Sequence, residues 1–121
     1  MEFNPLHLRQ QLADHGSQWA DQNAAASVLE ETKSTLKSQI ALKFLPDAGS
    51  AAKAEIMAEA TKEYIDHIKS MVEARRLANR ARAQYDSDRA YIELLRSQES
   101  TARAMKNLDN FNPTQVRKDR Q

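Results

Sequence analysis

The sequence lacks cysteine altogether, has only two glycines and three prolines among 121 residues, and contains no long apolar run. Without cysteine the chain can form no disulfide, no thiolate metal site and no thiol nucleophile. A β protein of this length needs several turns, so the scarcity of turn-forming residues beside abundant Ala, Glu, Arg and Leu predicts an all-α chain. No stretch of about 18 apolar residues is present, and the first residues lack the pattern of a signal peptide, so we expect a cytoplasmic protein with no membrane contact.

A cluster of turn-forming residues at positions 46–50 divides the chain. Residues 17–108 are therefore expected to form a helical hairpin with its turn near this cluster. Residues 1–16 are expected to form a short N-terminal helix that ends near Gly16, because glycine alone enters the left-handed cap conformation without a steric clash, although Gly16 could also be only a kink. Residues 109–121 are expected to be a flexible basic tail.

The C-terminal helix of the hairpin is expected to be very long, because residues 51–108 contain neither glycine nor proline. An unbroken helix of this length would extend about 87 Å. Apolar residues recur along it at seven-residue intervals, a period that favours coiled-coil or bundle packing. A bend at residues 86–88, whose side chains compete for backbone hydrogen bonds, is the alternative. The expected packing seam consists of Trp19, Leu29, Leu36, Ile40, Met57, Tyr64, Met71, Ala78, Tyr85 and Ile92.

The helix before the turn is long enough to cover only about half of the apolar stripe on the C-terminal helix. The part from about Arg80 onward needs the N-terminal helix, a bend, or another copy of the chain to cover it. Alanines in the same region permit close helix approach, which suits a tight dimer or bundle. We therefore expect a homo-oligomer.

Charge is segregated along the sequence although the formal net charge is only +1. Residues 1–49 and 50–73 each carry a net charge of -2, whereas residues 74–121 carry +5. Five arginines at seven-residue intervals form what we call the arginine stripe: Arg75, Arg82, Arg89, Arg96 and Arg103. The stripe could bind nucleic-acid phosphates, or it could be a solvated or inter-subunit face neutralised by nearby acidic residues. The candidate contacts to a partner or to phosphates are Arg75, Arg76, Arg80, Arg82, Arg89, Arg96, Arg103, Arg117, Lys118 and Arg120.

No pattern of catalytic chemistry is present in the sequence. The three histidines lie far apart, at His7, His15 and His67, and match no metal-binding motif. The two glycines are too far apart to form a phosphate-binding loop. Tyr85 could stack on a nucleic-acid base, but its heptad position favours packing. We expect no catalytic residue, no metal and no cofactor, and hence a protein that is not an enzyme.

The C-terminal helix carries a family resemblance. The segments at residues 78–85 (ANRARAQY) and 91–105 (YIELLRSQESTARAM) resemble small helical proteins encoded by temperate phages. The resemblance covers roughly the last 30 helical residues. It implies a phage or prophage protein of unassigned activity, from a group often found among genes for replication and recombination.

Three functions are compatible with these patterns. The first is a self-associating helical assembly protein that presents its arginine-rich helix to a protein partner. The alternative is a nonspecific DNA-binding accessory protein of phage recombination or replication, with the arginine stripe on the phosphates. The third is an inhibitor of a DNA-processing enzyme, in which the acidic residues 1–73 imitate nucleic acid.

Overall fold

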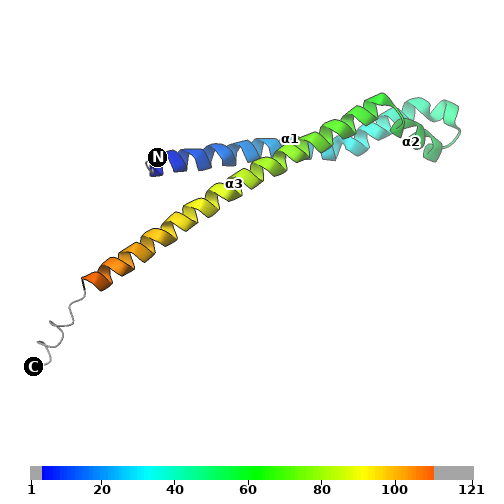
Figure 1. The fold of residues 1–121 in the computed structure, drawn as a ribbon. Coiled ribbons are helices and arrows are strands. Elements are labelled where there is room, and N and C mark those ends of the chain that lie inside the picture. The colour runs from blue at the N-terminus through cyan, green and yellow to red at the C-terminus, as the bar shows by residue number, and fades with distance from the viewer. Residues whose placement is uncertain (1–3, 111–121) are drawn as a thin grey trace, which may run out of the picture. The chain divides into compact units, whose positions relative to one another are not determined.

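The computed structural model describes residues 4–110, which form three α-helices and no β-strand (Figure 1). Helix α1 spans Pro5–Ala48, α2 spans Ala51–Glu59 and α3 spans Lys62–Asp109. The prediction of an all-α helical hairpin with a very long C-terminal helix is confirmed. The chain divides into two compact units, Met1–Tyr85 and Asp86–Gln121, and each is described by itself.

Helix α1 begins as its sequence suggests, but it continues further than expected. The Asn4 side chain accepts hydrogen bonds from the backbone N–H groups of Leu6 (3.0 Å) and His7 (3.2 Å), which caps the first turn. The helix then runs without a break through Gly16, in place of the short separate helix expected over residues 1–16. A side chain at Gly16 would meet the Tyr85 ring at 3.2 Å, so this glycine permits close packing and does not end the helix.

The turn between α1 and α2 falls at Gly49 and Ser50, within the expected residues 46–50. Gly49 adopts the left-handed conformation with φ of 79°, and its N–H donates to the Leu45 carbonyl at 3.4 Å. The Ser50 hydroxyl then accepts a hydrogen bond from the Lys53 N–H at 3.2 Å and caps α2. Two adjacent caps therefore end one helix and start the next.

The long helix expected after this turn is interrupted near its start, where no break was expected. Residues Ala60 and Thr61 separate α2 from α3, whereas α3 runs through residues 86–88 without a break. The Thr61 hydroxyl donates to the Ala58 carbonyl at 2.7 Å and accepts from the Tyr64 N–H at 3.3 Å. A threonine hydroxyl thus ends one helix and caps the next without glycine or proline.

Small side chains form the core of the first unit. Helix α1 and the first part of α3 run side by side in opposite directions, and α2 packs beside α1 at the closed end (Figure 1). Within residues 4–110 no large side chain is fully buried. Alanines let two helices approach closely, so the unit depends on close backbone packing more than on bulky core residues. The buried residues are Ala26, Ile40, Ala41, Ala48, Ala54, Ala58, Ala78 and Ala81.

Most of the predicted packing seam lies inside this unit. Leu36, Met57 and Tyr64 pack against the buried cluster around Ile40, and Ala78 is itself buried. The remaining members are half-buried, and they are Trp19, Leu29, Met71, Tyr85 and Ile92. A polar contact joins the same helices, because His67 Nε2 donates to the Leu29 carbonyl at 2.8 Å.

Within residues 4–110, no helix combines the length and the apolar character needed to cross a bilayer.

Candidate functional site

Arg75, the first member of the arginine stripe, binds the other helix of its own hairpin. Its Nε and one terminal nitrogen donate to the two carboxylate oxygens of Glu30 at 2.7 and 2.9 Å. Its other terminal nitrogen donates to the Asn23 side-chain oxygen at 2.8 Å. The two parallel hydrogen bonds to Glu30 form the bidentate pairing that the planar guanidinium group favours. Arg75 therefore fastens α3 to α1.

Three further arginines also contact groups on this chain. Arg76 donates to both carboxylate oxygens of Glu73, at 2.9 and 2.6 Å. The Arg82 guanidinium lies 5.6 Å from the centre of the Trp19 ring, within the range of a cation–π contact. Arg89 forms a longer ion pair of 4.0 Å with Glu93, one turn further along α3.

The remaining candidate arginines within residues 4–110 are Arg80, Arg96 and Arg103, and they make no hydrogen bond or ion pair with any residue in that range. Three further candidates, Arg117, Lys118 and Arg120, lie outside the described residues. The charge segregation also disappears on folding, because residues 1–85 hold 11 basic and 11 acidic side chains. The net charge of residues 74–121 in the sequence is therefore a poor guide to the charge of the folded surface.

The pair between Arg75 and Glu30 predicts a pH dependence of stability. Hydrogen bonds from Arg75 hold the pKa of the Glu30 carboxyl below its ordinary value of 4.5. A carboxyl group whose pKa is lower in the folded chain than in the unfolded chain stabilises the fold at pH values above its unfolded-state pKa. That stabilisation is lost as the pH falls through the folded-state pKa. The melting temperature of the native chain should therefore exceed that of Glu30→Gln at neutral pH, and the difference should shrink between about pH 5 and about pH 3.

Glu31→Gln is the matched control for this measurement. Glu31 is an exposed neighbour on α1 that makes no ion pair within residues 4–110. Its difference from the native chain should stay flat over the same pH range. A difference for Glu30→Gln that did not change with pH would mean that the ion pair contributes nothing to folding.

An aromatic contact joins α1 to the last turn of the first unit. The rings of Trp19 and Tyr85 lie 5.5 Å apart between centres at an interplanar angle of 35°, within the range of favourable aromatic pairs. Tyr85 also lies against the backbone of α1 at Gly16. Trp19 and Tyr85 therefore pack against each other, which favours a packing role for these two rings over stacking on nucleic-acid bases.

The second unit carries an exposed face with a heptad pattern. Along residues 86–109 of α3, the apolar side chains at Tyr91, Leu94, Met105 and Leu108 are 50%, 54%, 62% and 71% exposed. Together with two polar residues they occupy positions 91, 94, 98, 101, 105 and 108, which alternate by three and four residues. This spacing places all six on one side of a helix, as in the contact stripe of a coiled coil.

Charge is absent from this side of the helix. Between residues 90 and 108 the five charged side chains, Glu93, Arg96, Glu99, Arg103 and Lys106, all fall on the opposite side in the heptad. The positions that flank the apolar stripe hold small or apolar residues instead. We call this surface the uncharged face, and it consists of Ala90, Tyr91, Leu94, Leu95, Ser97, Gln98, Thr101, Ala102, Ala104, Met105 and Leu108.

The seven-residue spacing of apolar residues does not identify this surface. The seven-residue series of the predicted seam ends at Ile92, which is half-buried and is not part of this surface. The apolar stripe of the uncharged face begins at Tyr91 instead. Its signal was the alternation of three and four residues together with the confinement of charge to the other side.

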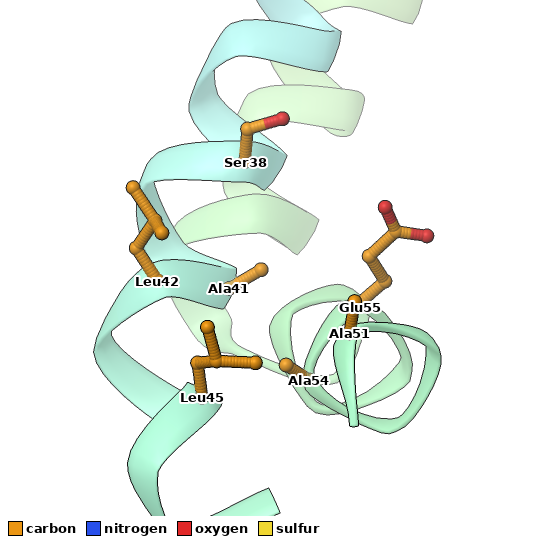
Figure 2. Close-up of a pocket in the computed structure, with 7 residues that line it drawn as sticks. All are labelled: Ser38, Ala41, Leu42, Leu45, Ala51, Ala54 and Glu55. Carbon is orange, nitrogen blue, oxygen red and sulfur yellow. The ribbon is translucent and has the colours of Figure 1, made fainter. Parts of the chain in front are cut away.

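A second apolar surface lies at the closed end of the hairpin. Figure 2 shows a groove between α1 and α2, with Leu42 and Leu45 on one side and Ala51 and Ala54 on the other. The groove has a volume of about 240 Å³ and carries two polar side chains, Ser38 and Glu55. It is open and shallow, and neither polar group is buried. Its lining offers contact area but no arrangement for chemistry.

Metal-binding residues do not converge in the described part of the chain. No three His, Asp or Glu side chains between residues 4 and 110 lie close enough together to hold a metal ion.

No known protein family, curated protein or solved structure matches this chain.

Proposed function

We propose that this protein is a non-enzymatic, self-associating helical assembly protein of phage or prophage origin that acts in the cytoplasm. One observation carries the proposal: the uncharged face presents four large apolar side chains, each at least half exposed, on a single side of one helix. Exposed apolar patches of a few hundred Å² often serve as interaction sites. The charged side of the same helix remains available to a protein partner.

The uncharged face needs a partner for physical reasons. Helices in proteins gain most of their stability by packing an apolar side against another element. The face is about 28 Å long and about 10 Å wide, so it covers roughly 300 Å². A standard interface buries about 800 Å² per partner. Association through this face alone is therefore reversible, with a micromolar or weaker dissociation constant.

The arginine contacts favour a protein partner over DNA. Arg75 and Arg76 each bind a carboxylate with two hydrogen bonds, and a phosphate would have to displace those carboxylates. Arg96 and Arg103 lie on the charged side of the second unit beside Glu93 and Glu99, a mixed surface that suits a protein more than a polyanion. The nucleic-acid mimic has little support, because basic residues balance the acidic ones within residues 1–85.

Light scattering of the full chain tests this function. We expect the mass to rise from 13.7 kDa towards twice that value as the concentration increases through the micromolar range. Leu94→Glu should keep the chain monomeric, since a charge buried in an apolar contact is costly. Ser100→Glu places the same charge on the opposite side of the same helix and should associate like the native chain. A native chain that stayed at 13.7 kDa at every concentration would refute the proposal.

A further inference from the structure

We propose that the second copy binds the uncharged face in an antiparallel orientation, with Leu94 of each chain at the level of the partner's Met105. This inference rests on the proposed self-association and specifies its geometry. The antiparallel register pairs Tyr91 with the partner's Leu108, Leu94 with the partner's Met105, and Gln98 with the partner's Thr101. The twofold axis then passes between Gln98 and Thr101, and both chains contribute the same surface.

The order of the six stripe residues suits this register. Read from residue 91 to residue 108, two apolar positions are followed by two polar positions and then by two apolar ones. In an antiparallel pair, apolar residues face apolar residues and polar residues face polar residues only when this order of residues is the same in both directions along the helix. A parallel pair imposes no such condition on the order. The symmetry of the stripe is therefore an observation that the antiparallel pair requires and the parallel pair leaves unexplained.

Side-chain sizes also favour the antiparallel pair. A parallel pair would place Tyr91 opposite its own copy and Thr101 opposite its own copy. Two tyrosine side chains would then crowd one layer of the interface, and two threonine side chains would leave space in another. In the antiparallel pair the long Gln98 faces the short Thr101, and the amide and hydroxyl groups can hydrogen-bond to each other. Large residues opposite small ones give layers of even volume, as close packing requires.

The boundaries of the uncharged face fit a contact of limited length. Ala90, Ser97 and Ala104 recur at seven-residue intervals along one edge, so two helices can approach closely there. Asp109 stands in the flanking position just outside the last layer. This carboxylate limits the contact at the C-terminal end of the face, because burying a charge in an apolar contact is unfavourable.

Disulfide trapping tests the orientation, and the chain suits it because it contains no native cysteine. Two variants are made, Leu94→Cys and Met105→Cys, and each is oxidised alone and in an equal mixture. In the antiparallel pair the two copies of position 94 lie about 16 Å apart along the axis, too far for a bond that needs Cα atoms within about 7 Å. We expect covalent dimers in the mixture, mostly with one chain of each variant, and few in either variant alone.

Sedimentation of each variant before oxidation separates this inference from the proposed function. Efficient disulfide formation by Leu94→Cys alone would mean a parallel pair and would overturn the inference. Dimers that sediment as such but give no mixed disulfide would also overturn it, while leaving self-association intact. If the two substitutions weaken association, Tyr91→Cys with Leu108→Cys tests the same register at the outer layers. A native chain that is monomeric throughout would overturn both.

Discussion

Replacing Ala58 by leucine is expected to lower the free energy of unfolding by about 1–3 kcal/mol. Ala58 is fully buried and belongs to the cluster that includes Ile40 and Ala54, where α2 packs against α1. Leucine adds three carbon atoms where the helices already pack closely, so side chains must leave their preferred rotamers or the helices must separate. The Ala58 carbonyl also accepts the hydrogen bond from the Thr61 hydroxyl, so a displaced α2 would disturb the start of α3.

Ala52→Leu is the matched control for this prediction. Ala52 lies on the exposed side of the same helix, and alanine and leucine differ little in helix propensity. We expect urea unfolding, followed by circular dichroism, to place the control within about 0.5 kcal/mol of the native chain. Equal effects of the two substitutions would mean that α2 does not pack against α1 through Ala58.

Replacing Trp19 by alanine is expected to be at least as destabilising, by about 2–3 kcal/mol. This estimate lies below the ~3–5 kcal/mol of a fully buried aromatic residue, because Trp19 is only half-buried. The substitution removes the ring contact with Tyr85 and the contact with the Arg82 guanidinium. Both contacts join α1 to α3, so their loss should loosen the hairpin at residues 16–19 and 82–85.

A double-mutant cycle isolates the aromatic contact from simple loss of volume. Trp19→Ala, Tyr85→Ala and the double variant should give a coupling energy of about 1 kcal/mol. Trp19→Phe keeps an aromatic ring and should recover part of the lost stability. Additive effects of the two alanine substitutions would show that the rings do not stabilise each other.

The outline of the fold follows from local signals in the sequence. Gly49 and Ser50 are capping residues whose preferences act over a few neighbouring residues, so they mark the turn without any knowledge of tertiary structure. The heptad spacing of apolar residues likewise depends only on helix geometry. These signals are sufficient for an all-α hairpin with a long C-terminal helix.

Two departures from the expected helices arise because tertiary context decides them. Gly16 has the chemistry of a helix terminator, yet it serves close packing against Tyr85, a residue distant in sequence. The break at Ala60 and Thr61 depends on one hydroxyl that both donates and accepts hydrogen bonds. Threonine also occurs inside helices, as Thr32 does in α1, so residue type alone does not predict this break.

The spacing of residues in the sequence also does not predict which groups the arginines contact. Local acidic residues suggest ion pairs within one helix, as Arg76 forms with Glu73. Arg75 instead pairs with Glu30, which the hairpin brings from the other helix. Which charges remain available to a partner therefore depends on the alignment of α1 with α3, and residue spacing alone does not reveal that alignment.

The uncharged face could have been found from the sequence by a different comparison. The seven-residue series through Ile92 indicates the predicted packing seam and not the uncharged face. Mapping charge onto the heptad of residues 90–108 identifies a side with no charged residue, and this mapping needs only helix periodicity. Whether that side is covered is a property of the fold, and the exposure of Leu94 and Leu108 supplies it.

Amide hydrogen exchange at two protein concentrations tests directly whether a second copy buries the uncharged face. We predict that exchange in residues 90–108 slows as the concentration rises through the micromolar range, while residues 20–45 of α1 exchange at the same rate at both concentrations. Equal exchange in residues 90–108 at low and high concentration, or slowing confined to the groove between α1 and α2, would contradict the account.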